Sequence, residues 1–411
     1  MRVRRNVFDF LILIALFPVY LLGKLIPKDN RLYVFGSSLG YHFADNSKYL
    51  FLYANENVKN ITSVFISKNR RVVGLLRSNN MQAEFLYSFA GLRTVMRAKK
   101  AFLSHSLNDI HPLLLGGAQV IQLWHGTPLK KIGNDANWIS ENTKAFLKNM
   151  VRKASYALFP YLYGSNRFDF IVASSQFLIP SYMSAFGIDK TRISVAGQPR
   201  NDCLSGDFVM NTKIFSESQF LRKLRDDWEL VISWLPTYRK PAPTSIVNLL
   251  DDYGFSEREV NKRLRDLKAV LVIKPHFLEL DLLNEYLKDS SNIQVYNHAD
   301  PYPLIRYTDI LITDYSSVYF DYLLVGKPMI FTPFDMPDYV RRNAGFYYDY
   351  DEVTPGPKCT DWRAVIDEIE KTARSIRTGT DDPYLESRAK VKALFNAHDS
   401  NFSKRIVDHC F

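Results

Sequence analysis

The sequence predicts an α/β fold made of two Rossmann-like domains that face a cleft. After Pro27, short apolar runs alternate with amphipathic stretches of helical length. Strands interleaved with helices are typical of βαβ units around a mainly parallel sheet. The same alternation is repeated in the second half of the chain. The length of 411 residues suits two domains of ordinary size.

The chain begins with an apolar segment, which we assign to residues 1–27. Three of the first five residues are arginines, and the uncharged run of residues 10–22 follows. That run is short for a spanning helix, which needs about 20 apolar residues, and no small-residue cleavage site follows it. We therefore expect a membrane-associating helix in the cytoplasmic leaflet, with the arginines on anionic head groups. A single span, with Lys24 reaching the interface, and an apolar helix packed on the protein itself are the alternatives.

Residues 28–205 are predicted to form the first Rossmann-like domain. Segments of helical length, such as residues 46–55, separate most of its expected strands. These strands are residues 31–35, 61–66, 83–87, 101–103, 120–124, 170–173 and 193–195. The weakly patterned residues 206–218 are the expected linker to the second domain.

Residues 206–378 are predicted to form the second Rossmann-like domain. Its expected strands are residues 230–234, 270–273, 293–295, 310–313 and 329–331. Residues 361–377 have the clearest helical pattern. Their apolar face consists of Trp362, Val365, Ile366, Ile369 and Ala373. Residues 379–411 are assigned to a C-terminal helical segment.

Charge and cysteine content narrow the class of partner. The net charge of +10 favours anionic partners such as nucleic acid, acidic lipid or phosphate-rich substrates. No helix-turn-helix, zinc-finger or RNA-binding signature accompanies this charge, so we expect no nucleic acid partner. The three cysteines are scattered, which suits a reducing compartment and indicates neither a disulfide framework nor a metal knuckle.

Polar motifs occur where predicted strands end, which is where ligands bind in open α/β sheets. In residues 122–130, His125 follows a strand that is expected to end at Trp124. Gly126 lets the backbone turn, and Thr127 and Lys130 are candidate contacts to the acceptor or the cleft. A histidine exposed there titrates near neutral pH, so His125 is a candidate general base for an acceptor hydroxyl. The alternative is a histidine that only bonds neighbouring backbone.

Cations and hydroxyls follow two strands of the second predicted domain. Lys274 can offset phosphate charge, and His276 can donate a hydrogen bond to a phosphate oxygen or a leaving group. Thr237 and Arg239 follow the first strand and offer a hydroxyl and a guanidinium, which also suit phosphate. A purely structural Lys-Pro-His turn is the alternative for Lys274 and His276.

Two adjacent serines, Ser316 and Ser317, follow Asp314 at the end of another strand. We expect them to open a helix whose amides and dipole form an anion site that suits a diphosphate. Capping by Asp314 or Ser316 explains part of the pattern.

Arg200 and Asp202 lie near the predicted domain junction. Direct ligand contact and a hinge turn held by pairing between these two residues fit the sequence equally well. The sequence has no Gly-x-Gly-x-x-Gly motif after a strand and no Walker loop, so NAD and ATP sites lack support. No histidine pair has zinc spacing, and we assign no metal.

Six motifs in a fixed order resemble those of a known family. They are Asp45-Asn-Ser-Lys48, Trp124-His-Gly-Thr-Pro, Gly197-Gln-Pro-Arg-Asn-Asp, Pro236-Thr-Tyr-Arg, Lys274-Pro-His and Thr313-Asp-Tyr-Ser-Ser. Each motif is weak alone, but six in order from about residue 26 to the C-terminus are specific. The chain therefore resembles the CDP-glycerol glycerophosphotransferase family, the teichoic-acid primases and polymerases. It departs from the family near its C-terminus, where residues 399–405 only loosely match a segment that contacts the donor.

The resemblance implies a glycosyltransferase-B type fold whose last helix crosses back to the first domain. It implies transfer of glycerol phosphate from CDP-glycerol to a hydroxyl of a lipid-linked anionic polymer, teichoic acid or capsule, at the cytoplasmic face of the cell membrane. In this family pattern His125 is the base and His276 a second essential histidine. Ser316 and Ser317 hold the donor diphosphate, and Thr237 with Arg239 binds phosphate.

Several alternatives stay open at this point. We expect no metal or other cofactor, because fixed cations and a helix N-terminus can neutralise a diphosphate. The donor polyol is glycerol or ribitol. A nucleotide-sugar glycosyltransferase of the same architecture and a non-catalytic module that grips anionic envelope polymer are the rival functions.

Overall fold

The structure is a computed structural model that describes residues 17–136, 168–205, 207–239, 245–287, 290–343, 345–380 and 382–411. These residues divide into two compact units. Unit 1 comprises the described residues of Met1–His125, Ser140–Asp202 and Asn401–Phe411, and unit 2 comprises those of Gly126–Ile139 and Cys203–Ser400.

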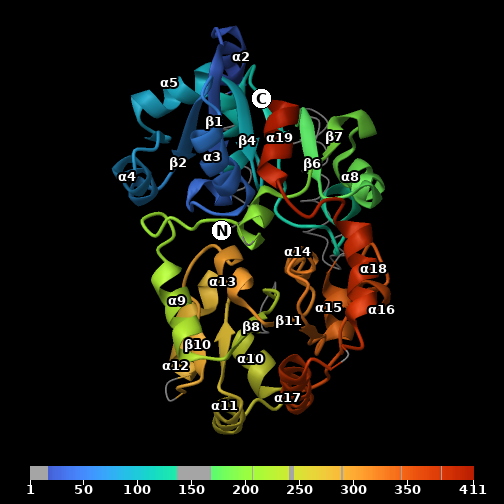
Figure 1. The fold of residues 1–411 in the computed structure, drawn as a ribbon. Helices are drawn as coiled ribbons and strands as arrows, with labels where there is room; N and C mark the ends of the chain where they lie inside the picture. The colour runs from blue at the N-terminus through green and yellow to red at the C-terminus, as the bar shows by residue number, and fades with distance from the viewer. Residues whose placement is uncertain are drawn as a thin grey trace, which may run out of the picture. The chain divides into compact units, whose positions relative to one another are not determined.

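Unit 1 is built on a seven-stranded parallel sheet with the strand order β3-β2-β1-β4-β5-β6-β7. The strands are β1 (Asp29–Gly36), β2 (Thr62–Ser67), β3 (Ala83–Phe85), β4 (Ala98–Leu103), β5 (Gln119–Gln122), β6 (Phe170–Ala173) and β7 (Ile193–Val195). The helices with them are α3 (Asp45–Asn57), α4 (Arg70–Ser78), α5 (Phe89–Arg97), α8 (Ile179–Phe186) and α19 (Phe402–Cys410). Helices α3 and α19 lie side by side (Figure 1).

Unit 2 is built on a five-stranded parallel sheet with the order β10-β9-β8-β11-β12. The strands are β8 (Leu230–Leu235), β9 (Ala269–Ile273), β10 (Ile293–Val295), β11 (Ile310–Thr313) and β12 (Met329–Phe331). The helices are α9 (Ser218–Asp227), α10 (Ile246–Asp251), α11 (Glu257–Asp266), α12 (Leu280–Tyr286), α13 (Tyr302–Tyr307), α14 (Val318–Tyr322), α15 (Met336–Arg342), α16 (Tyr350–Val353), α17 (Trp362–Thr378) and α18 (Leu385–Phe395).

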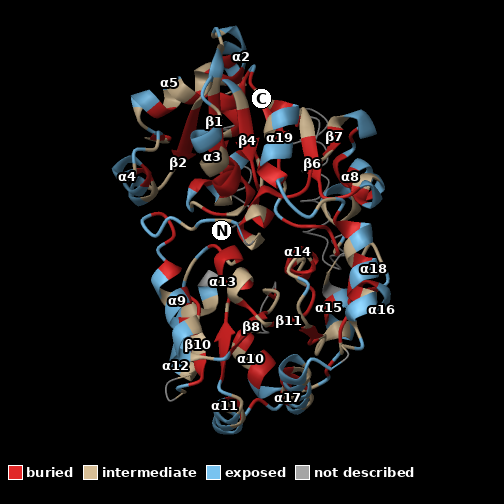
Figure 2. Cartoon of the chain, viewed as in Figure 1, coloured by how far each residue is buried: buried red, intermediate tan, exposed pale blue. Residues whose placement is uncertain are grey.

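Every strand of the described residues overlaps a predicted strand, so the α/β class with parallel sheets is confirmed. The periodicity of α17 is confirmed as well. Its five predicted core residues are all buried, and Asp361 caps its start by accepting a hydrogen bond from the Ala364 amide. Figure 2 shows this pattern of burial: the strands are buried, and α17 and α18 expose their outer faces.

The core of unit 2 fills both faces of its sheet. Side chains alternate along a strand, so Ile232 and Trp234 of β8 lie in one apolar cluster, while Val231 lies in the other. The Trp234 ring meets the Trp362 ring of α17 edge to face, with centroids 4.8 Å apart. This packing fixes the strand ends that carry the polar motifs.

The last two helices belong to different units. In unit 2, Asn396 just after α18 donates a hydrogen bond to the Phe320 carbonyl oxygen at 2.8 Å. In unit 1, Asp202 accepts hydrogen bonds from the Phe402 and Ser403 amides at 2.9 Å each, which holds the start of α19. The chain therefore returns to unit 1 in its last residues.

The described part of the N-terminal segment forms helix α2 (Phe17–Leu25), which packs on unit 1. Tyr20 is buried, and Gly23 lies so close to Gly116 that an added Cβ would be 3.4 Å from the Gly116 Cα. Leu22 and Leu25 on the same helix are exposed. Within the described residues, no helix has the length and apolar content to cross a bilayer. Residues 1–16 of the predicted segment lie outside the described residues.

Candidate active site

The loop that carries His125 begins earlier than predicted. Strand β5 ends at Gln122 rather than at Trp124, because the Trp124 backbone turns into the left-handed region with a φ of 61°. That conformation costs roughly 1–3 kcal/mol and persists only where its surroundings fix it. The Gln122 side chain accepts a hydrogen bond from the Trp124 amide at 3.0 Å, and Asn46 donates to the Trp124 carbonyl oxygen at 2.7 Å. These two bonds fix the direction in which His125 leaves the sheet.

The imidazole of His125 is held in one tautomer. Its Nδ1 lies 3.3 Å from the Ser104 carbonyl oxygen. A carbonyl oxygen can only accept, so Nδ1 carries the proton and Nε2 carries the lone pair. The His125 side chain is exposed. An exposed imidazole with an Nε2 lone pair has the geometry that a general base requires.

The surroundings of His125 keep its imidazole neutral at pH 7. Desolvation lowers the pKa of His125, the neighbouring His105 and Arg200 lower it further, and Asp45 opposes them. Because solvent reaches the ring, the shift of the His125 pKa is smaller than in a dry site, but its direction is the same. The lone pair is therefore present at neutral pH.

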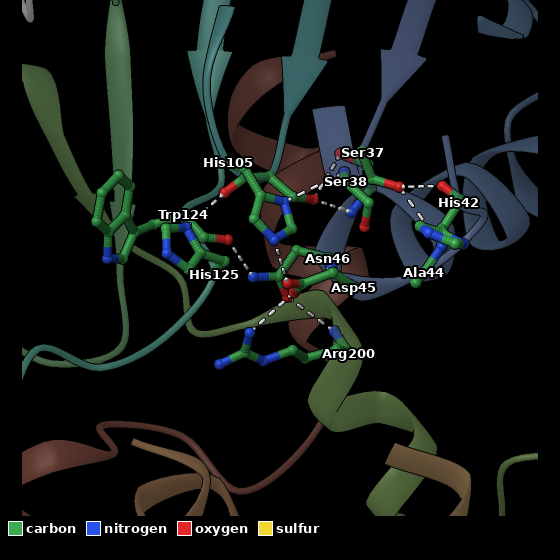
Figure 3. Close-up of polar contacts among 12 residues, drawn as sticks. Ser37, Ser38, His42, Ala44, Asp45, Asn46, His105, Trp124, His125 and Arg200 are labelled. Carbon is green, nitrogen blue, oxygen red and sulfur yellow. Dashed lines mark hydrogen bonds and ion pairs between the residues drawn. The ribbon is translucent and has the colours of Figure 1, made fainter. Parts of the chain in front are cut away.

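Two further residues beside His125 were not predicted from the sequence to have a catalytic role. Asp45 begins α3 and His105 follows β4, and both lie beside His125 in Figure 3. His105 Nε2 lies 3.6 Å from Asp45 Oδ2, and the two imidazole rings are stacked. The rule that identified His125, a polar side chain just after a strand, applies equally to His105.

Arg200 pairs with Asp45 rather than with Asp202, so a hinge turn held by Arg200–Asp202 pairing is wrong. The Arg200 Nη1 lies 2.8 Å from Asp45 Oδ1, and the Arg200 side chain is 2% exposed. Asp202 instead caps α19. Both residues lie in a 3₁₀ turn (Pro199–Leu204), where residues two apart point to different sides because the turn has three residues per revolution.

In unit 2, the guanidinium of Arg239 is enclosed by carboxylates. Its Nε and Nη2 donate hydrogen bonds to Asp335 at 3.0 and 2.7 Å, and its Nη1 donates to Asp314 and to the Thr237 carbonyl oxygen. Burial disfavours the charge, but the two carboxylates outweigh it and raise the pKa of Arg239. Asp314 also accepts the Thr237 amide at 2.8 Å. Arg239 and Asp314 thus join the loops after β8 and β11 to the start of α15.

Lys274 and His276 follow β9 and are both half-buried. Burial lowers the pKa of Lys274, and Asp300 opposes this effect. His276 Nδ1 accepts a hydrogen bond from the Leu278 amide at 3.4 Å, so the neutral imidazole carries its proton on Nε2. The Tyr238 ring stacks on it with centroids 4.1 Å apart. This tautomer suits a donor to a phosphate oxygen.

Ser316 and Ser317 precede a short helix. Helix α14 has five residues, and Ser317 at its cap position makes no side-chain capping bond. Ser316 Oγ accepts a long hydrogen bond from the Val318 amide at 3.5 Å. A helix of little more than one turn has a small dipole. Anion binding here would therefore rest on the hydroxyls and backbone amides.

Gly126, Thr127 and Lys130 belong to unit 2, and the first two are buried. Lys130 forms an antiparallel bridge with Phe346, and its Nζ lies 5.9 Å from the centre of the Tyr339 ring. Burial lowers the pKa of Lys130 to about 8, Asp314 opposes this shift, and Arg239 adds to it. Lys130 therefore lies near the groups expected at the donor side.

The candidate residues form two groups, and all of them except Lys130 follow strands of the sheet in their own unit. Strands β9, β8 and β11 are neighbours, so the loops that follow them meet at one edge. The group in unit 1 consists of Asp45, His105, His125 and Arg200. The group in unit 2 consists of Lys130, Thr237, Arg239, Lys274, His276, Asp314, Ser316 and Ser317.

Parallel α/β sheets with a candidate base and phosphate-suited cations after their strands are the arrangement expected of a transferase that acts on a phosphorylated donor. Residues 19–411 match the model of the family described as CDP-Glycerol:Poly(glycerophosphate) glycerophosphotransferase, and the chain belongs to this family. The enzyme class predicted from the six motifs is thereby confirmed.

The chain is also similar to individual proteins of teichoic acid synthesis. A teichoic acid glycerol-phosphate transferase of Staphylococcus aureus is 25% identical over 99% of both chains. A teichoic acid poly(glycerol phosphate) polymerase of Bacillus spizizenii is 27% identical over 86% of both chains. The solved structure of the wall teichoic acid polymerase TagF has the same fold, with a TM-score of 0.70 at 24% identity over 99% of this chain and 96% of that chain.

Proposed function

We propose that the chain transfers glycerol phosphate from CDP-glycerol to a hydroxyl of a membrane-linked cell-envelope polymer such as teichoic acid. The acceptor oxygen attacks the phosphorus next to glycerol, the bond from that phosphorus to the bridging oxygen breaks, and CMP leaves. The acceptor proton passes to His125 Nε2. The observation that carries the mechanism is the His125 tautomer, whose Nδ1 is bonded to the Ser104 carbonyl oxygen and whose Nε2 is left as a base.

We assign acceptor activation to unit 1 and donor binding to unit 2, as in an enzyme of the glycosyltransferase-B type. His125 supports the first assignment. The second is supported by side chains that follow neighbouring strands of the unit 2 sheet, namely Thr237, Lys274, His276, Ser316 and Ser317. It is also supported by Lys130, which is close enough to Asp314 and Arg239 for their charges to act on its pKa. The bonds of Arg239 to Asp314 and Asp335 support a positioning role for these residues, which would order the loops that bind the donor.

We place the enzyme at the cytoplasmic face of the cell membrane. The exposed leucines of α2, Leu21, Leu22 and Leu25, support this location, because they lie beside Lys24 on a short apolar helix. The names of the relatives, which refer to teichoic acid, are consistent with an acceptor at the envelope.

The test of this function is the choice of donor. Purified protein would be incubated with a lipid-linked acceptor and CDP-glycerol, CDP-ribitol or UDP-sugars, and the released CMP or UDP would be measured. We expect acceptor-dependent release of CMP from CDP-glycerol. Release of UDP from a UDP-sugar without release of CMP would instead identify a glycosyltransferase.

Donor binding is expected to weaken as the pH rises through the pKa of Lys130. Only the protonated ammonium attracts the donor diphosphate, and its pKa is about 8. The KM for CDP-glycerol should therefore rise about tenfold from pH 7 to pH 9. Steady-state kinetics would show a flatter profile and a higher KM at pH 7 for Lys130→Met. Lys131→Met, which removes an adjacent exposed lysine, should keep the native profile. An unchanged KM and profile in Lys130→Met would reject the assignment.

Transfer is expected to continue after divalent cations are chelated. In the proposed mechanism, Lys130, Lys274 and the Nε2–H of His276 offset diphosphate charge, which is the task that a metal performs in many phosphoryl transferases. CMP release would be compared before and after dialysis against a chelator. A loss of turnover that added Mg²⁺ restores would contradict this prediction.

A further inference from the structure

His125 stacks on His105, and the edge of the His105 ring contacts an anion. The His105 and His125 rings are parallel, with an interplanar angle of 7° and centroids 4.6 Å apart. At the edge of its ring, His105 Nε2 lies 3.6 Å from Asp45 Oδ2 (Figure 3). We call these three residues, His125, His105 and Asp45, the His–His–Asp stack.

The middle member of the stack is held in one orientation. The Ser38 amide donates a hydrogen bond to His105 Nδ1 at 3.2 Å, so the proton of the neutral ring lies on Nε2 and faces Asp45. The backbone of His105 is fixed on both sides. Its amide donates to Asp109 at 2.6 Å, and its carbonyl oxygen accepts from Gln122 at 3.3 Å. A ring fixed in this way also fixes the plane of a ring stacked on it.

The last member of the stack is a partly buried carboxylate, 14% exposed, that is kept ionised. Burial favours the neutral acid, but Arg200, His105 and His125 outweigh it and lower the pKa of Asp45. Arg200 contacts it at 2.8 Å, and the Asn46 amide donates to the same Oδ1 at 2.7 Å. Asp45 also has a left-handed φ of 60°, which aspartate tolerates better than most residues do. The negative charge is therefore fixed in place.

We infer that the His–His–Asp stack sets the ring plane and the basicity of His125. His105 positions the ring, and Asp45 stabilises the positive charge that His125 gains when its Nε2 accepts the acceptor proton. That proton stays on His125, and none passes to His105 or Asp45. His105 and Asp45 are thus positioning residues, and the inference rests on the proposed role of His125 as the base.

Two substitutions should move the basicity of His125 in opposite directions. The side chains that act on its charge are His105 and Arg200, which disfavour it, and Asp45, which favours it; the bonded Ser104 carbonyl oxygen favours it as well. Asp109, the other charged group beside His105, lies 4.0 Å from its Nδ1. Asp45→Asn removes the favourable charge, so the pKa of His125 should fall. His105→Phe keeps a flat ring but removes an unfavourable neighbour, so the pKa should rise. Each shift should be about one unit.

The two predicted shifts of the His125 pKa can be measured on the full chain by a method that does not depend on turnover. NMR titration of ¹³C-labelled histidines gives the pKa of His125 directly, with its signal assigned by its loss in His125→Ala. The acidic limb of the kcat profile should move with it, to lower pH in Asp45→Asn and to higher pH in His105→Phe. At each pH, the KM for CDP-glycerol should equal that of the native protein. His409→Gln, which removes an exposed histidine of α19, should leave both measurements unchanged.

The outcomes separate this inference from the proposed function. A purely structural role would lower kcat or stability in both variants without moving the His125 titration, and shifts in the same direction would also overturn the inference. Asp45→Asn leaves the buried Arg200 without its carboxylate partner, which can impair folding. If the Asp45→Asn variant does not fold, His105→Phe provides the test. If His125→Ala retained turnover, the base assignment would fail, whereas the NMR shifts would still decide whether the stack controls the basicity of His125.

Discussion

His125→Ala is expected to lower the turnover of CDP-glycerol by about 10²- to 10⁴-fold, the usual contribution of a general base. The substitution removes the Nε2 lone pair that would take the acceptor proton. It removes no residue that we assign to donor binding, because all of those residues belong to unit 2. The loss should therefore appear in kcat, while the affinity for CDP-glycerol stays close to that of the native protein.

The measurement combines CMP release with calorimetric titration of CDP-glycerol. His125→Gln is a useful companion, because it keeps a polar side chain that can bond the Ser104 carbonyl oxygen but supplies no base. Both variants should show this loss of turnover and should still bind the donor. His111→Gln is the matched control, since Nδ1 of His111 is also bonded to the backbone, here as the acceptor from the Leu113 amide, but His111 caps a separate 3₁₀ turn (Pro112–Leu115). Near-normal turnover in His125→Ala would show that another group takes the proton.

The fold could be predicted because its signals are local. Apolar runs bounded by polar loops mark the strands, and the spacing of Trp362, Val365 and Ile369 marks the buried face of α17. The position of His125 could be predicted for a related reason. In a parallel sheet, the residue after a strand lies at the edge where ligands bind, so a single position in sequence implies a position in space.

The partners of the site residues could not be predicted in this way, because they come from distant parts of the chain. Arg200 pairs with Asp45 rather than with Asp202, which is two residues away. The left-handed backbone of Trp124 depends on Asn46, which is far away in sequence, and no local propensity favours that conformation for tryptophan. Such contacts depend on the order of the strands in the sheet, and the periodicity of a single segment does not predict that order.

Arg239→Met is expected to destabilise unit 2 by about 3–5 kcal/mol, because it removes one partner of a buried ion cluster. Asp314 and Asp335, whose side chains are 2% and 14% exposed, would both lose the guanidinium that pairs with them. Methionine fills similar space, so the loss would come mainly from the unpaired carboxylates. Urea unfolding would report it through the fluorescence of Trp234 and Trp362, which are buried in the core of unit 2.

A second arginine in unit 2 provides the contrast that identifies the cause. Arg263 contacts Asp367 and Glu370 at 2.6 Å each, but these carboxylates are 58% and 29% exposed. Water solvates them when the arginine is lost, so Arg263→Met should cost no more than about 1 kcal/mol. Adding Asp335→Asn to Arg239→Met should recover part of the lost stability, because it removes one of the two unpaired charges. Equal losses for the two arginines would mean that burial of the carboxylates is not what makes Arg239 important.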